Sequence, residues 1–190
     1  MILVIGLGNP GGQFDRTRHN IGREIAEEFA RAAGGAPPAD FRFEKKWNAQ
    51  VAEAKIDREK IAILLPDTMM NKSGSACAPA ARFYKIKPKD IFVIHDDADI
   101  PLGQTKLSFA KNSAGHKGVE SIIRVLKTKE FWRLRIGIAG RRDIPAERLV
   151  LKKFTPDESR TIKKIIRRTI NALRTIAETN PQKAMNEFNQ

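Results

Sequence analysis

Polar side chains of the kinds used in catalysis are concentrated in three short segments, Thr17–Asn20, Met69–Gly74 and His95–Asp99. Each lies at the end of an apolar element. Asn9 follows one apolar strand, Asn71 follows another after a short loop, and Asp96 follows a third. In open α/β sheets, ligands bind in the crevice outside the carboxyl ends of the strands. We therefore expect these side chains to share one crevice.

His19 is the side chain best suited to acid–base chemistry. An imidazole acts as a general base near neutral pH when a carboxylate holds its second ring nitrogen as N–H. Asp96 or Asp97 could supply that carboxylate, because three acids within four positions need a histidine, a cation or solvent to offset their repulsion. Two plainer interpretations stay open at this point: His19 as a helix cap or surface residue, and Asp96–Asp99 as a solvated turn.

Other chemistries are less favoured. Neither Ser73 nor Cys77 stands in a nucleophile elbow, which disfavours covalent catalysis. No metal site is expected, because the acids and His95 lack a recognised ligand spacing. The single cysteine excludes an internal disulfide and a multi-thiolate zinc site.

The segment Gly6–Gly11 matches the dinucleotide pattern G-x-G-x-x-G after an apolar strand. Two details argue against a nucleotide cofactor. The helical period begins only at Asn20, whereas the fingerprint should open directly into a helix, and no acidic residue ends a second strand about 20 residues on. We expect instead a tight loop beside a substrate that presents Asn9. A plain turn with local hydrogen bonds is the simpler alternative.

Hydrophobic periodicity places these segments in an α/β fold. Strands are predicted at 2–5, 41–46, 49–56, 60–65, 91–94, 105–109 and 134–139. Helices are predicted from Asn20, at 73–84, at 117–126, from Pro156 and at 181–188, with Pro79 expected to kink the second or shift its start. The long helix from Pro156 has the clearest start, because Thr155 and Glu158 form a capping box. Strands interleaved with helices predict a three-layer α/β domain, and 190 residues fit a single one.

Charge gives the first indication of a partner. The net charge is +13, and residues 101–190 hold most of it. Such an excess favours a polyanion, because each neutralised phosphate releases counterions, although a plain basic surface is an equal alternative. Most basic residues of the long helix are expected to form a solvated face. No apolar run approaches the ~20 residues of a membrane helix, so we expect a soluble, cytoplasmic protein.

Five ordered motifs resemble those of bacterial-type peptidyl-tRNA hydrolases. They are GLGNPG (6–11), TRHNIG (17–22), MNKSG (70–74), HDDADIPLG (95–103) and AGHKG (114–118), and the resemblance runs nearly end to end. It implies a monomeric, single-domain α/β fold over residues 1–190, with a twisted mixed sheet flanked by helices. It also implies cleavage, without a cofactor, of the ester between a peptide and the terminal ribose of tRNA, which recycles tRNA from stalled translation. The implied partner is peptidyl-tRNA, bound by its acceptor arm and terminal adenosine, with no obligatory protein partner.

The resemblance also implies roles for individual residues. His19 matches the catalytic histidine, and Asp96 matches the aspartate that orients it. Three asparagines match positions that line the cleft or fix its loop, and two basic residues match positions near the tRNA acceptor stem: Asn9, Asn20, Asn71, Lys106 and Arg135. As a hypothesis, His19 deprotonates a water that attacks the ester carbonyl, while Asn71, with Asn9 or a backbone amide, stabilises the oxyanion.

Three departures from the family pattern affect binding. Lys117 replaces an asparagine assigned to the reacting water or the tRNA end; it cannot accept a hydrogen bond but can reach a phosphate. Phe14 replaces a common tyrosine near the substrate. Ser108 stands where a basic residue is usual, a role that Lys111 or Lys117 could take over. Lys117→Asn should speed hydrolysis if the lysine is a handicap, and slow it if the lysine is an adaptation. The alternative function is a non-catalytic RNA-binding relative with the same fold.

Overall fold

A seven-stranded mixed sheet forms the centre of the molecule. The computed structural model describes residues 1–33, 40–140 and 144–189. The strand order is β2-β3-β4-β1-β5-β7-β6. The four central strands, β4, β1, β5 and β7, run parallel, whereas β2–β3, β3–β4 and β6–β7 pair antiparallel. The strands are β1 (Ile2–Gly6), β2 (Arg42–Glu44), β3 (Ala49–Ile56), β4 (Glu59–Pro66), β5 (Ile91–Pro101), β6 (Thr105–Phe109) and β7 (Trp132–Ala139).

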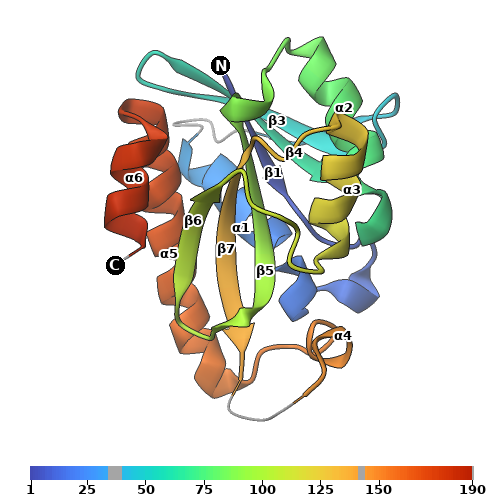
Figure 1. Ribbon diagram of the computed structural model, residues 1–190, viewed down its shortest axis with the longest axis vertical. Coiled ribbons are helices and arrows are strands. Elements are labelled where there is room, and N and C mark those ends of the chain that lie inside the picture. Colours follow the sequence, from blue (N-terminus) through green and yellow to red (C-terminus); the bar gives the residue numbers. More distant parts are fainter. Residues whose placement is uncertain (34–39, 141–143, 190) are drawn as a thin grey trace.

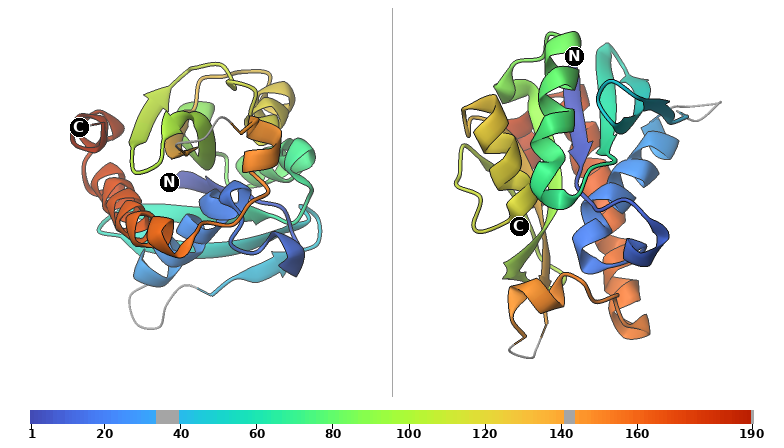
Figure 2. Two further views of the ribbon diagram at one scale, coloured as in Figure 1. Left: turned by 90° about the horizontal axis from the view of Figure 1, so that it is seen from below. Right: turned by 90° about the vertical axis from the view of Figure 1, so that its right-hand side faces the viewer.

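Helices cover both faces of this sheet (Figures 1 and 2). One face carries α1 (Ile21–Ala33) and α5 (Pro156–Glu178), and the other carries α2 (Ser73–Phe83) and α3 (Lys117–Leu126). Helix α6 (Pro181–Phe188) packs beside α5 and β6, and the short α4 (Ala146–Leu149) lies near the end of the sheet to which β5 points. This is the predicted three-layer α/β arrangement.

The alternation of side chains along β1 shows why the sheet is buried on both faces. Val4 points into the core beneath α1 and α5, whereas Leu3 and Ile5 point into the core beneath α2 and α3. Successive strand residues face opposite sides, so a strand covered on both sides must be apolar throughout. Burying each such side chain contributes about 1.5–3 kcal/mol.

Most predicted elements are confirmed, including the capping box at Thr155 and Glu158. The predicted end of one strand is wrong. Strand β5 does not end before His95 but continues to Pro101, so Asp96 and Asp97 are buried strand residues rather than part of a solvated turn. Helix α2 starts at Ser73, as predicted, with Pro79 inside it, so of the two expected effects of Pro79 the shifted start does not occur. Helix α4 was not predicted, because four residues are too few to show a helical period.

Gly6 at the end of β1 and Gly22 in the first turn of α1 allow close packing between α1 and the sheet. A Cβ atom at Gly6 would meet the Ala26 side chain of α1, and one at Gly22 would meet the carbonyl oxygen of Ile94 on β5. These contacts hold the start of α1 against the carboxyl ends of β1 and β5. Because α1 starts only at Ile21, the loop lacks the direct entry into a helix that a dinucleotide site needs.

The order of the parallel strands fixes where a site can form. The chain goes from β1 outward to β4 and then crosses back to place β5 on the other side of β1. Gly6 at the end of β1 lies beside Ile94 on β5. Connections that leave neighbouring strands in opposite directions open a crevice at this switch point. The segment that follows β1 and the residues that follow Ile94 therefore meet there.

Candidate active site

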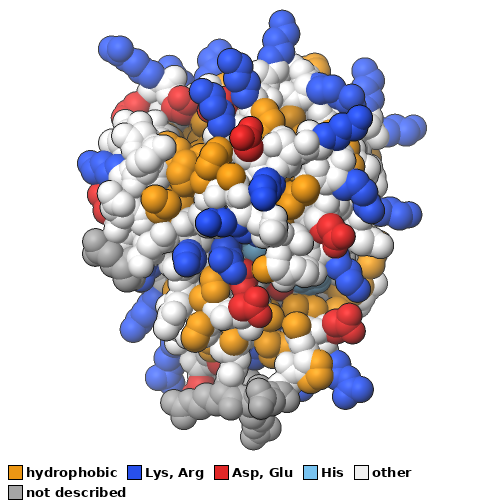
Figure 3. All heavy atoms as spheres, viewed as in Figure 1, with side chains coloured by type: hydrophobic (Ala, Val, Ile, Leu, Met, Phe, Trp, Pro, Cys, Tyr) orange, Lys and Arg blue, Asp and Glu red, His pale blue; other side chains and the backbone are white. Residues whose placement is uncertain are grey.

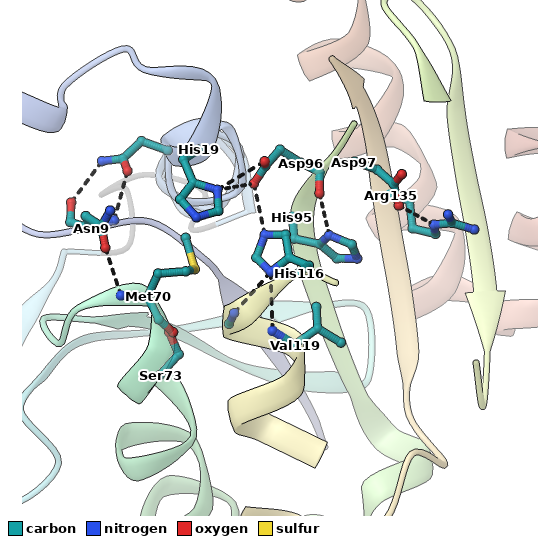
Figure 4. Close-up of polar contacts among 12 residues, drawn as sticks. Asn9, His19, Met70, Ser73, His95, Asp96, Asp97, His116, Val119 and Arg135 are labelled. Carbon is teal, nitrogen blue, oxygen red and sulfur yellow. Dashed lines mark hydrogen bonds and ion pairs between the residues drawn. The ribbon is translucent and has the colours of Figure 1, made fainter. Parts of the chain in front are cut away.

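His19 and Asp96 meet at this crevice from distant parts of the chain (Figure 4). His19 lies in the 3-10 turn Arg18–Asn20 that leads into α1. Its Nδ1 lies 2.9 Å from Oδ1 and 3.0 Å from Oδ2 of Asp96. Asp96 is 2% exposed on β5. Because an ionised carboxylate only accepts, Nδ1 of His19 donates to Asp96, and in the neutral imidazole the lone pair is then on Nε2.

His116 is a second histidine on the same carboxylate, and the sequence analysis did not assign it a role. Its Nε2 lies 3.0 Å from Oδ1 of Asp96. Its Nδ1 is the N-cap acceptor of α3, since the N–H groups of Gly118 and Val119 point at it from 3.2 and 3.3 Å. Those amides require a lone pair on Nδ1, so Nε2 is the protonated nitrogen and donates to Asp96. The signal in the sequence was a histidine at the start of a predicted helix.

These partners keep Asp96 ionised. Burial alone would raise the pKa of its carboxyl group, but His116 and His19 outweigh burial and hold that pKa far below its usual range. The neighbouring His95 is different: burial, His116 and Arg133 lower its pKa well below 6.5, so it is neutral. His95 donates from Nδ1 to the carbonyl oxygen of Asp96 at 2.6 Å and thereby helps fix the backbone there.

The loop after β1 is organised by two asparagines. Asn20 accepts a hydrogen bond from the backbone N–H of Asn9 at 2.8 Å and donates to its carbonyl oxygen at 2.9 Å. The side-chain Oδ1 of Asn9 in turn accepts the N–H of Met70 at 2.8 Å. Asn9 thus joins the loop after β1 to the segment that carries Asn71. Asn20 is buried and holds the backbone of this loop.

A cleft of about 430 Å³ opens beside these residues. In Figure 3 it appears as a hollow with histidine at its base and acidic and hydrophobic side chains around it. Five of the predicted site residues line it, namely Asn9, His19, Asn71, Asp96 and Lys117. Its apolar walls come from residues that the sequence analysis did not single out for substrate binding, including Met69, Met70, Val150 and Leu151.

The other predicted site residues lie outside the lining of this cleft: Phe14, Asn20, Lys106, Lys111 and Arg135. Phe14 is half-buried in the 3-10 turn after Gly11, and Lys111 is exposed between β6 and α3. Arg135 donates from Nε to Oδ2 of Asp97 at 2.6 Å, and Lys106 lies opposite it on β6. The Asp97–Arg135 ion pair shows that Asp97 has its own partner and does not compete with Asp96 for His19.

The cluster of His19, Asp96 and His116 also has the composition of a metal site. Its candidate ligand atoms lie within 4.8 Å of one another. However, to bind a metal through Nε2, His116 would have to move its proton to Nδ1, where two backbone N–H groups already point. The α3 cap therefore favours hydrogen bonding to Asp96 over metal coordination at this cluster.

A histidine oriented by a buried carboxylate, in a cleft at the carboxyl ends of the parallel strands, is the arrangement of an enzyme that uses acid–base catalysis. Comparison with known proteins specifies the class: the sequence profile of peptidyl-tRNA hydrolases matches residues 3–190. The chain belongs to the peptidyl-tRNA hydrolase family. The resemblance noted in the sequence is thus confirmed, and with it the expectation of an enzyme that acts on peptidyl-tRNA.

Individual relatives support this assignment over the full length. The chain is 41% identical over 192 residues to the peptidyl-tRNA hydrolase of Desulfitobacterium hafniense, with 100% of both chains covered. It is 36% identical to that of Aquifex aeolicus, covering 99% of this chain and 96% of the relative. The crystal structure of the Acinetobacter baumannii enzyme matches with a TM-score of 0.90 at 30% identity, covering 100% of this chain and 94% of that one. Among the described helices, none has the length and apolarity to cross a membrane.

Proposed function

We propose that the protein hydrolyses the ester between the peptide and the 3′-terminal ribose of tRNA, with His19 as the general base. The observation that carries this proposal is the ionised Asp96 carboxylate on Nδ1 of His19, which leaves the lone pair on Nε2 beside the cleft. Nε2 takes a proton from a water, and the resulting hydroxide adds to the ester carbonyl carbon. The imidazolium then returns the proton to the leaving ribose oxygen, and Asp96 stabilises the positive charge between these steps.

Neutral amide donors stabilise the oxyanion that forms on the carbonyl oxygen. Asn71 is exposed at the rim of the cleft, and Asn9 is held by its bond to Met70, so only its amide NH₂ group remains to donate to a ligand. A preorganised donor of this kind contributes about 10²–10³ in rate. Asn20 acts indirectly, because its bonds to the backbone of Asn9 set the position of that amide.

Direct attack by water is favoured over covalent catalysis. Ser73 is fully buried, and its hydroxyl donates to the carbonyl oxygen of Met70. Cys77 is also fully buried, and burial raises the pKa of its thiol, so no thiolate forms at neutral pH. Neither side chain lines the cleft. The nucleophile in the proposed reaction is therefore water.

Basic residues around the cleft bind the RNA part of the substrate. Lys117 lies at the cleft itself, while Lys106 on β6 and Lys111 in the segment after it supply positive charge for the acceptor arm and terminal adenosine. Arg135 on β7 lies opposite Lys106, and its ion pair with Asp97 holds its guanidinium in place. Phosphate contacts of this kind fix the position of a nucleic acid without reading its sequence. One enzyme can therefore serve many tRNAs. Phe14 adds an apolar contact where the family usually has a tyrosine.

The protein acts as a single-domain monomer in the cytoplasm, where its substrate is made. A non-catalytic RNA-binding role is not favoured, because phosphate binding alone requires neither a buried His19–Asp96 pair nor asparagines in the cleft. The direct test is release of the acyl group from purified N-acetyl-aminoacyl-tRNA and from the same tRNA with a free amino group. Cleavage of the N-blocked substrate alone supports the proposal, and cleavage of neither contradicts it.

A further inference from the structure

Arg18, the residue before His19, has a buried side chain that the chemistry above does not use. It is 5% exposed, which is unusual for an arginine. Its Nη2 lies 2.9 and 2.7 Å from the two carboxylate oxygens of Glu158 at the start of α5. Its guanidinium also lies over the ring of Phe154, 4.8 Å from the centroid, and Nη1 points to the carbonyl oxygen of Ile138 on β7 at 3.4 Å.

Glu158 also caps helix α5, which links the ion pair to the backbone. Its Oε2 accepts the N–H of Thr155 at 2.8 Å, which completes the capping box of α5. Burial would raise the pKa of Glu158, but the Thr155 N–H and the Arg18 guanidinium outweigh it and lower that pKa. The carboxylate therefore stays charged at neutral pH and fixes the point where the chain enters α5.

The backbone on either side of Arg18 holds the wall of the cleft. The N–H of Arg18 donates to the carbonyl oxygen of Lys152 at 2.9 Å, and the N–H of His19 donates to that of Val150 at 2.9 Å. Thr17 forms a bridge with Lys153. Val150 and Leu151 belong to this paired segment and line the cleft together with His19.

We propose that Arg18, through Glu158, is a positioning residue that holds the Val150–Leu151 wall of the cleft in place beside His19. This role rests on the proposed function, because its purpose is to shape the binding site for the acyl-ribose end of the substrate. Without the ion pair, the two backbone hydrogen bonds and the bridge described above remain between this segment and the Thr17–His19 turn, but the start of α5 is no longer fixed to Arg18. The wall then samples positions that bind substrate less well, while His19 keeps its bond to Asp96.

The test is steady-state hydrolysis of N-acetyl-aminoacyl-tRNA by Arg18→Met and Glu158→Gln. Arg18→Met keeps the length of the side chain and removes its charge, and we expect KM to rise about tenfold with kcat within about twofold. Glu158→Gln keeps an oxygen for the cap, and we expect KM to rise about threefold. In the double variant KM should equal that of Arg18→Met, because the two substitutions break the same Arg18–Glu158 interaction. Arg18→Lys should recover part of the loss.

The two single variants separate positioning from simple attraction to tRNA. Arg18→Met removes a positive charge and Glu158→Gln removes a negative one, so attraction alone would raise KM in the first and lower it in the second. The matched controls are Arg42→Met and Glu53→Gln, which change the same charges at an exposed ion pair on β2 and β3. They should leave KM within about twofold.

Circular dichroism and thermal melting establish that each variant is folded at the assay temperature. If the unmodified protein turns over and both variants keep its KM, or lose only kcat in proportion to unfolded protein, Arg18 has no positioning role. If the unmodified protein does not turn over, the proposed function itself is contradicted.

Discussion

Nε2 of His116 lies 3.0 Å from Oδ1 of Asp96, the same oxygen that receives Nδ1 of His19 at 2.9 Å. The carboxylate is thus held from two sides by imidazoles on different elements. His116 is itself fixed by the backbone N–H groups at the start of α3. The orientation of His19 therefore depends on a chain of contacts that begins at a helix cap.

Asp96→Asn tests the proton arrangement. The amide NH₂ can donate to Nδ1 of His19, which moves the imidazole proton to Nε2 and removes the base. We expect kcat to fall by about 10⁴, as for the corresponding change in a Ser-His-Asp triad. The value of kcat is measured from time courses of N-acetyl-aminoacyl-tRNA hydrolysis. A variant with more than a tenth of the original kcat would show that the carboxylate does not set the tautomer.

His116 can be tested apart from its structural role. Asparagine is a good N-cap, so His116→Asn keeps the start of α3 but loses the imidazole donor to Asp96. We expect kcat about tenfold lower with an almost unchanged melting temperature. His116→Ala should lose the cap as well, with about 1 kcal/mol less stability. Equal kcat for His116→Asn and the original protein would mean that His116 serves only as a cap.

The buried His95 is expected to lower the stability of the protein at mildly acidic pH. Its pKa in the folded protein is lowered well below 6.5, first by burial and then by the neighbouring His116 and Arg133. Below about pH 6.5 the unfolded chain binds a proton there and the folded chain does not, so the free energy of unfolding falls by up to about 1.4 kcal/mol per pH unit. His95→Leu should show a flatter profile in denaturant titrations at pH 7, 6 and 5. If the free energy of unfolding fell equally with pH in the two proteins, a neutral buried His95 would be excluded.

Lys117 is predicted to act on RNA binding. It is exposed at the cleft, and its Nζ lies 4.0 Å from the Glu147 carboxylate of α4. We expect Lys117→Asn to weaken tRNA affinity severalfold, to reduce the slope of log K against log salt by about one, and to lower kcat/KM accordingly. Fluorescence anisotropy at several salt concentrations measures this.

The matched control for Lys117 is Lys60→Asn, which removes an exposed lysine near the start of β4. The cleft lies at the other end of the parallel strands. Lys60→Asn should leave the salt slope unchanged. Faster hydrolysis by Lys117→Asn would instead show that the lysine hinders the reaction.

The fold was largely predictable because its signals are local. Strand β6, helix α3 and helix α6 have the bounds that their hydrophobic period and caps indicate, and the Thr155–Glu158 capping box is present. Strand β5 was underestimated because Asp96 and Asp97 break its apolar pattern. Histidines and Arg135 from other elements compensate these charges, which no local pattern can show.

The sequence predicts the central His19–Asp96 pair of the site, but not the residues that hold this pair and the cleft in place. His19 and Asp96 stand out by residue type and by their place after apolar elements. His116 and the Arg18–Glu158 pair depend on contacts across the fold, the latter between residues 140 positions apart. Asn20, grouped with the substrate-binding residues and expected to help fix the loop, hydrogen-bonds through its side chain to the backbone of Asn9.

The most direct test of His19 as the base is the comparison of the original protein with His19→Ala in single-turnover hydrolysis of N-acetyl-aminoacyl-tRNA, with tRNA affinity measured in parallel. His19→Ala should lose essentially all hydrolysis while its affinity for tRNA stays within about threefold, since the basic residues are untouched. Hydrolysis at the original rate by His19→Ala would contradict the mechanism, whatever its affinity for tRNA.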